Sequence, residues 1–249
     1  MMELSLSSWI LAVLCAIMIG MAKTGVTGLG TLVVPLMAFI FGGMPSSGLV
    51  LPMLIMADIF GVVYYHRSTQ WKTVFKVLPW AFLGIFGGLI VGKNISALQF
   101  KQLIGVLVIL SLVVMIWLEV RKTKKTEIVP HKAWFAFPFG IMGGFSTMIG
   151  NAAGPIMSVY LLSKNLPKKV YIGTAAWFFF IVNLSKLPLQ IWGWNNITFI
   201  TISFNFILLP AIALGAFLGI KIVKLIPEDA YRWFVVIATF ISALALLIK

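Results

Sequence analysis

The first stretch whose residue types could bind a ligand is residues 22–31, AKTGVTGLGT, which interrupts a long apolar run. It combines a base, three hydroxyl groups and three glycines: Lys23, Thr24, Thr27, Thr31, Gly25, Gly28 and Gly30. A helix that breaks here exposes backbone N–H groups and the positive end of a helix dipole, and both attract an anion. Hydroxyl groups add hydrogen-bond donors, and glycines let the backbone approach a ligand closely. The stretch therefore predicts a site for a small anion.

A second break, GGFSTMIGNAAGP at 143–155, has the same character. Its predicted anion ligands are the side chains or backbone of Ser146, Thr147, Gly150, Asn151 and Gly154. Proline is favoured in the first turn of a helix, so Pro155 predicts that a helix begins nearby. The helices predicted to start near Thr31 and near Pro155 direct their N-termini toward the loop tips, where both can bind one anion.

Lys23 allows two interpretations. Its ammonium contacts the anion directly, or it caps the C-terminus of the preceding helix, where a cation is favoured. A lysine at membrane depth costs about 2.5–3.5 kcal/mol, so an unpaired side chain facing lipid is not expected.

Three further polar residues interrupt apolar segments. Asp58 either binds a coupling ion, H⁺ or Na⁺, or pairs with Lys23 or Lys186 and holds helices together. Asn183 and Lys186 are three residues apart and share a helix face, so they line the site or extend toward the outer surface. Pro188 follows and predicts a kink.

The composition of the chain indicates an integral membrane protein. The chain has 249 residues, of which 61% are hydrophobic and only 10% are charged, far below the quarter typical of soluble domains. It has a formal charge of +13, but the bases lie in short loops, so a nucleic-acid surface is not expected. One cysteine and two histidines make a metal site improbable and predict no cofactor.

Apolar segments predict the helices. Full spans are expected at 46–65, 74–92, 100–119, 170–190, 198–220 and 231–248, because a span needs about 20 residues. The pairs 8–22 with 28–42, and 133–149 with 153–163, are too short. We therefore interpret 8–42 and 133–163 as two re-entrant helical hairpins.

Loop charges predict the orientation. Loops 66–72, 121–132, 164–169 and 221–232 hold most bases and are assigned to the cytoplasm, whereas 42–46, 93–100 and 190–197 hold only Lys93. The first hairpin then enters from outside and the second from the cytoplasm. The expected location is the cytoplasmic membrane.

The two halves align in order. Residues 78–93 match 209–224 at an offset of 131, which pairs Gly84 with Gly215 and Gly88 with Gly219. Upstream, Gly20 matches Gly144 at an offset of 124. We predict an all-α polytopic membrane protein with two inverted repeats, 1–120 and 133–249, joined by the basic linker 121–132. Each repeat has a broken hairpin and three spans, an arrangement used by secondary transporters. The paired glycines at i and i+4 are expected to pack helices.

The blocks GMAKTGVTGLGTLVVPLM and GGFSTMIGNAAGPIMSVYLL, each opening one half, resemble the TauE/SafE sulfite exporter family. The segments LIMADIFGVVYYHRSTQWKTVFKVLPW and FFFIVNLSKLPLQIWGWNN extend the resemblance over essentially the whole chain. This resemblance implies a permease for a small sulfur-containing anion such as sulfite, thiosulfate or an organosulfonate.

The sequence thus predicts a non-enzymatic transporter that works by alternating access and holds an anion at mid-membrane. An anion channel with the same fold is the alternative. The direction of transport, the coupling ion and the oligomeric state stay open.

Overall fold

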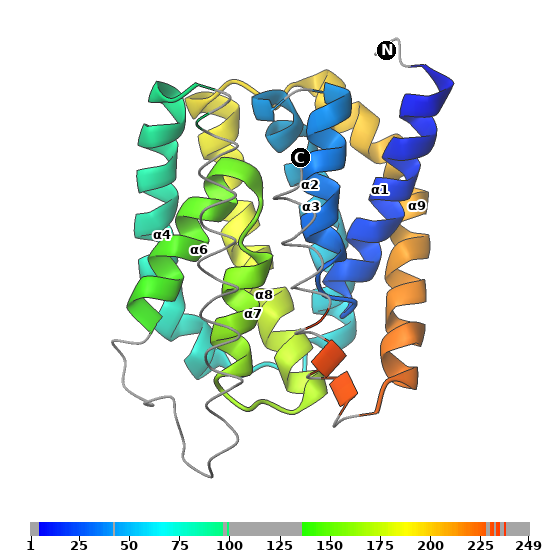
Figure 1. Ribbon diagram of the computed structural model, residues 1–249, viewed down its shortest axis with the longest axis vertical. Helices are drawn as coiled ribbons and strands as arrows, with labels where there is room; N and C mark the ends of the chain where they lie inside the picture. The colour runs from blue at the N-terminus through cyan, green and yellow to red at the C-terminus, as the bar shows by residue number, and fades with distance from the viewer. Residues whose placement is uncertain are drawn as a thin grey trace.

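The computed structural model describes residues 5–41, 43–96, 99, 136–227, 230, 231, 233, 234 and 237. This part of the chain is helical and contains no strand (Figure 1). The predicted span 100–119, the basic linker 121–132 and nearly all of the predicted span 231–248 lie outside the described residues.

The elements follow the predicted order. They are α1 (Leu6–Lys23), α2 (Leu29–Phe41), α3 (Gly43–Tyr65), α4 (Trp71–Asn94), α6 (Ala136–Gly150), α7 (Gly154–Leu162), α8 (Lys168–Pro188), the π-helical turn η2 (Leu189–Gly193) and α9 (Phe199–Leu225). In the described part of the chain, five helices are long and apolar enough to cross a membrane: α1, α3, α4, α8 with η2, and α9. The chain is therefore a multi-pass membrane protein.

The first hairpin differs from the prediction in the length of α1. The Ser5 side chain caps the N-terminus by accepting from the Ser8 N–H, so α1 runs for 18 residues instead of the expected 15 of 8–22. At 1.5 Å per residue it is about 27 Å long, close to the thickness of the hydrocarbon core. The expectation that this piece is too short to span was wrong. In contrast α2, α6 and α7 have 13, 15 and 9 residues and stay short.

Two other boundaries are corrected. Most of the predicted outer loop 42–46 is the first turn of α3, which accommodates Pro45 because the N–H groups of a first turn have no helical partner. The helices after the breaks begin at Leu29 and Gly154, one or two residues before the expected Thr31 and Pro155.

Glycines set the closest helix contacts. A Cβ added at Gly84 of α4 would overlap the Ile141 carbonyl of α6, and one at Gly215 of α9 would overlap the Ile17 carbonyl of α1. Gly88 and Gly219 also face the neighbouring helix closely. These contacts confirm that the glycines pack helices. In each crossing, the first hairpin helix of one half lies against a span of the other half.

The described residues of three basic loops, 66–72, 164–169 and 221–232, lie at one end of the bundle, which we call the basic end (Figure 1). The amine of Lys168, at the start of α8, donates to the Val223 and Ile226 carbonyls at the end of α9 at 3.3 and 2.5 Å. The Gln70 N–H, before α4, donates to the Thr174 hydroxyl of α8 at 3.0 Å. The α6–α7 hairpin enters from this end and the α1–α2 hairpin from the opposite end (Figure 1).

Candidate functional site

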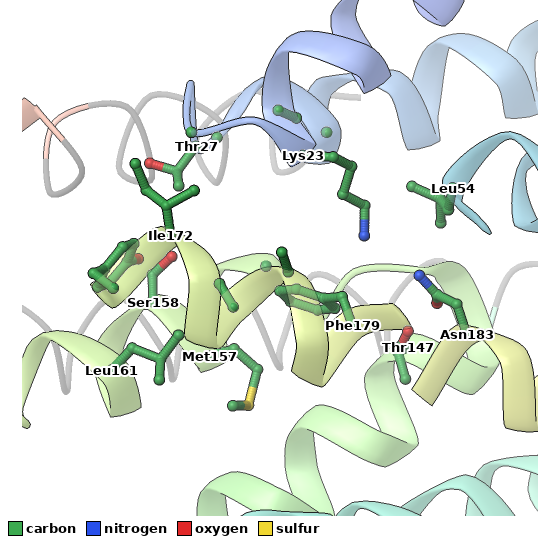
Figure 2. Close-up of a pocket in the computed structure, with 18 of the residues that line it drawn as sticks. Lys23, Thr27, Leu54, Thr147, Met157, Ser158, Leu161, Ile172, Phe179 and Asn183 are labelled. Atoms are coloured by element: carbon green, nitrogen blue, oxygen red, sulfur yellow. The ribbon is translucent and has the colours of Figure 1, made fainter. Parts of the chain in front are cut away.

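The two helix breaks line one pocket (Figure 2). The first break and the end of α1 contribute Lys23, Gly25, Thr27, Gly28 and Gly30; the second contributes Thr147, Asn151 and Gly154; α8 contributes Phe179 and Asn183. The cavity volume is about 90 Å³, which is room for about six water-sized groups. A small oxyanion therefore fits without displacement of a helix.

Backbone geometry explains the glycines of the first break. Gly25 and Gly28 have φ of 125° and 94°, a region that side chains with a Cβ rarely adopt. Tyrosines then satisfy carbonyls that the end of α1 leaves without helical donors: the Tyr65 hydroxyl donates to the Thr24 carbonyl at 3.2 Å, and the Tyr231 hydroxyl donates to the Gly25 carbonyl at 2.9 Å. The glycine conformations and these two hydrogen bonds together fix the backbone of the first break.

Lys23 is the last residue of α1 and the basic group of the pocket. Its Nζ lies 2.8 Å from Oδ1 of Asp58 on α3 and 4.4 Å from the centre of the Phe179 ring. Figure 2 shows the side chain extending from α1 toward Phe179, Thr147 and Asn183. The side chain of Lys23 is 11% exposed and that of Asp58 is fully buried. The ammonium thus faces both the carboxylate and the cavity.

Asp58 takes the ion-pair role that was one of its two predicted interpretations. Besides Lys23, it accepts a hydrogen bond from Nδ2 of Asn183 at 2.6 Å. The α1–α3 contact that supports this pair depends on Gly61, one turn beyond Asp58, because a Cβ there would lie 2.7 Å from the Lys23 carbonyl oxygen. Asp58 is the sole carboxylate in the part of the chain that the structure describes.

Lys186 orders the second break. Its side chain is fully buried, and its Nζ donates to the Thr147 carbonyl at 3.0 Å, the Thr147 hydroxyl at 2.8 Å and Oδ1 of Asn151 at 2.7 Å. All three ammonium hydrogens are therefore engaged. Neither of the two predicted roles holds, because Lys186 is not among the residues that line the pocket and its buried side chain does not extend to the outer surface. It stabilises the C-terminal end of α6, where a cation is favoured.

Asn151 has φ of 55°, the left-handed conformation that asparagine tolerates at a helix end. Its Nδ2 donates to the carbonyl and hydroxyl of Ser47, near the start of α3, at 3.2 and 3.4 Å. Nε2 of Gln190, in η2, donates to the same Ser47 hydroxyl at 3.3 Å. We call Ser47, Asn151 and Gln190 the polar cluster, and it lies on the side of the pocket away from the basic end.

Several predicted ligands lie elsewhere. The Thr24 hydroxyl is directed away from the pocket, within donating distance of the Gly20 carbonyl of α1 and the Ala216 carbonyl of α9, 3.0 Å from each. Ser146 is fully buried, and neither it nor Gly150 lines the pocket. Thr31 lies in α2, and its side chain is outside the described residues.

Two buried polar atoms have no hydrogen-bond partner and belong to residues that line the pocket, namely Oγ1 of Thr27 and Oδ1 of Asn183. A buried polar group without a partner costs about 1–3 kcal/mol, so a ligand or water that bonds to it is favoured. The Thr27 hydroxyl can donate to an anion, whereas Oδ1 of Asn183 can only accept.

Three residues of the site were not among the predicted ligands, namely Phe179, which lines the pocket, and Ser47 and Gln190 of the polar cluster. Phe179 has the strongest signal, because it belongs to an apolar FFF run one turn before Asn183, but packing explains such a run equally well. Ser47 lies near the start of the predicted span 46–65, and Gln190 lies where the predicted span 170–190 meets the loop 190–197. Their hydrogen bonds, from Asn151 to Ser47 and from Gln190 to Ser47, depend on how α3 and η2 meet. No group of three His, Cys, Asp or Glu residues that could hold a metal ion occurs in the described ranges.

Comparison with known proteins gives one result. The family model described as sulfite exporter TauE/SafE matches residues 12–246, nearly the whole chain. No curated protein and no solved structure matches significantly. The match agrees with the multi-pass helical architecture and with transport rather than enzymatic catalysis. The chain therefore belongs to the sulfite exporter TauE/SafE family of membrane transporters.

Proposed function

We propose that the protein moves a small sulfur-containing anion, such as sulfite, thiosulfate or an organosulfonate, across the cytoplasmic membrane. The observation that carries this proposal is that two helix breaks from opposite halves of the chain line one pocket together with the Lys23 ammonium. The pocket also lies at the N-termini of α2 and α7, because Gly28, Gly30 and Gly154 line it. Each N-terminus carries roughly half a positive charge.

The charges near the pocket favour an anion. Lys23 and Lys186 are two bases, and Asp58 is one carboxylate, so the formal charge of these three side chains is +1. These groups are buried or nearly buried, and opposite charges about 4 Å apart attract by about 4 kcal/mol at an effective dielectric constant of 20. An oxyanion beside Lys23, bonded to the Thr27 hydroxyl and to backbone N–H groups, balances this charge.

The shape of the pocket favours alternating access. From Lys23 and Asn183 the pocket continues along Ile172, Tyr171 and Leu161, which lie beside the 164–169 loop of the basic end. On the other side the polar cluster joins the second break to α3. The positive-inside rule assigns the basic end to the cytoplasm, so this conformation faces inward. Outward opening then requires the polar cluster to separate.

Binding of anions to the purified full-length chain in detergent tests the site. The probes are sulfite, thiosulfate, sulfoacetate and taurine, measured by calorimetry. We expect Lys23→Ala to weaken binding of the best probe at least tenfold, and Thr27→Val, which keeps the shape but removes the hydroxyl, to weaken it less.

Lys93→Ala is the matched control, because Lys93 is an exposed lysine in the last turn of α4, away from the pocket. It is expected to bind like the wild type. Equal affinity in the wild type and both pocket variants would remove the site from this pocket. Flux in liposomes that saturates with anion concentration is expected of a carrier, and non-saturating conductance would favour a channel.

A further inference from the structure

The ion pair at the pocket joins a buried carboxylate to an ammonium that the ligand also needs. Asp58 is fully buried and is not among the pocket-lining residues, whereas Lys23 is partly exposed and lines the pocket. Nζ of Lys23 is 2.8 Å from Asp58 Oδ1. An anion that binds to Lys23 from the cavity side therefore competes with a carboxylate that already holds the same ammonium.

Two negative groups on one ammonium are unfavourable in a buried site, because they repel one another and each loses part of its pairing. A proton on Asp58 removes the conflict. Resting on the proposed function, we propose that each anion bound at Lys23 is accompanied by one proton taken up by Asp58, so that the protein is a proton-coupled anion transporter. The proton comes from a buffer acid in the solution, which is left as its conjugate base, and forms an O–H bond on the carboxyl group, while the Lys23 side chain turns its N–H donors to the anion.

Asn183 is suited to both states of Asp58. In the present state its Nδ2 donates to Asp58 Oδ2 at 2.6 Å, and its own Oδ1 is buried without a hydrogen-bond partner. A protonated Asp58 needs an acceptor for its new O–H group. A rotation of the Asn183 amide places Oδ1 in that role, which satisfies an acceptor that is otherwise unpaired. The same pair of side chains thus bonds to a carboxylate and to a carboxylic acid.

The groups around Asp58 favour a proton over a sodium ion as the coupling ion. The Lys23 ammonium already lies against Asp58, and a metal cation there would sit beside a positive charge, whereas a proton needs no cavity and no further ligands. The other charged or titratable groups on α1 and α8, which pack against α3, are Lys186 of α8, buried near the pair, Lys168, Lys169 and Tyr171 at the start of α8, and Cys15 of α1, two turns before Lys23. The helices α2 and α6 carry none, and α9 carries only Lys221 and Lys224 near its end.

Calorimetry of thiosulfate binding to the full-length chain tests the coupling, because the charge of thiosulfate is constant across the neutral pH range. Repeating the titration in buffers of different ionisation enthalpy counts the protons taken up. We expect one proton per thiosulfate in the wild type. Since protons are taken up, affinity is expected to fall as pH rises, by up to about tenfold per pH unit. Asp58→Asn, a neutral isostere, is expected to bind without proton uptake and with no pH dependence.

The outcomes separate the two proposals. Thiosulfate binding that is lost in Lys23→Ala but takes up no proton in the wild type would overturn the coupling and leave the site intact. Proton uptake that persists in Asp58→Asn would also overturn it. Binding unchanged in Lys23→Ala, or no binding of any sulfur anion to the wild type, would overturn the proposed function and the coupling with it.

The wild-type proton count needs no variant, so it decides the question even where Asp58→Asn does not fold. Infrared difference spectra with and without thiosulfate give a second readout. We expect a carboxylic acid C=O band to appear with the anion in the wild type and to be absent in Asp58→Asn. Spectra without that band in the wild type would contradict proton uptake by Asp58.

Discussion

The crossing of α4 and α6 provides a quantitative test of the fold. Gly84 of α4 has no room for a side chain, because a Cβ there would meet the carbonyl oxygen and carbon of Ile141 and the N–H of Phe145, all backbone atoms. Gly87, one turn away on the same helix, would place its Cβ 3.8 Å from the Phe145 ring edge, an ordinary van der Waals contact. Gly84→Ala and Gly87→Ala therefore form a matched pair.

The expected magnitudes follow from two opposing effects. Alanine is more favourable than glycine in a helix by about 1 kcal/mol, and both variants gain this. Overpacking costs about 1–3 kcal/mol, and the upper end applies at Gly84 because backbone atoms cannot rotate away. Gly84→Ala is therefore expected to lose about 2 kcal/mol and Gly87→Ala to gain up to about 1 kcal/mol. For a chain of this size, a difference of about 3 kcal/mol separates the melting temperatures by roughly 6–12 °C.

The thiol of Cys15 can report thermal unfolding in this assay. Cys15 is the single cysteine of the chain and is fully buried in α1. A dye that becomes fluorescent on reaction with a thiol therefore reports unfolding during heating in detergent. The expected order of midpoints is Gly84→Ala below the wild type and Gly87→Ala at or above it. Equal midpoints for the two variants would refute the close contact between α4 and α6.

Three further changes probe the site and its supports. Lys186→Met leaves buried acceptors of the second break, including Oδ1 of Asn151, without a donor; each costs about 1–3 kcal/mol, so both the melting temperature and thiosulfate affinity are expected to fall, and an unchanged affinity would contradict the positioning role. Gly61→Ala pushes on the Lys23 carbonyl and is expected to weaken anion binding measured by calorimetry, with Gly87→Ala as the control. Lys168→Met removes the cation at the end of α9 and is expected to lower stability by about 0.3–1 kcal/mol in the thiol assay while anion affinity stays at the wild-type value.

The sequence by itself determined the class of the protein and the location of its breaks. Long apolar runs require a membrane. The breaks at 22–31 and 143–155 combine glycines with hydroxyl, amide or basic side chains, and this combination predicted that the helix ends there. These signals are local, so they were readable without any partner. Gly84 and Gly215 were likewise predicted to pack helices, because small residues at this spacing let two helix backbones approach closely. The inverted repeat stays a prediction that the two equivalent glycine crossings support.

The tertiary structure decided which polar groups meet. It pairs Lys23 with Asp58, directs the Thr24 hydroxyl away from the pocket and engages Lys186 with the second break. The sequence left the partners of Lys23 and Lys186 open and wrongly assigned the Thr24 hydroxyl to the anion, because a polar residue in an apolar helix requires a partner but does not specify one. The partner depends on the crossing and rotation of helices far apart in the chain. A rotation of α1 by one residue, about 100°, would turn Thr24 to the direction that Lys23 now takes and change the chemistry of the pocket.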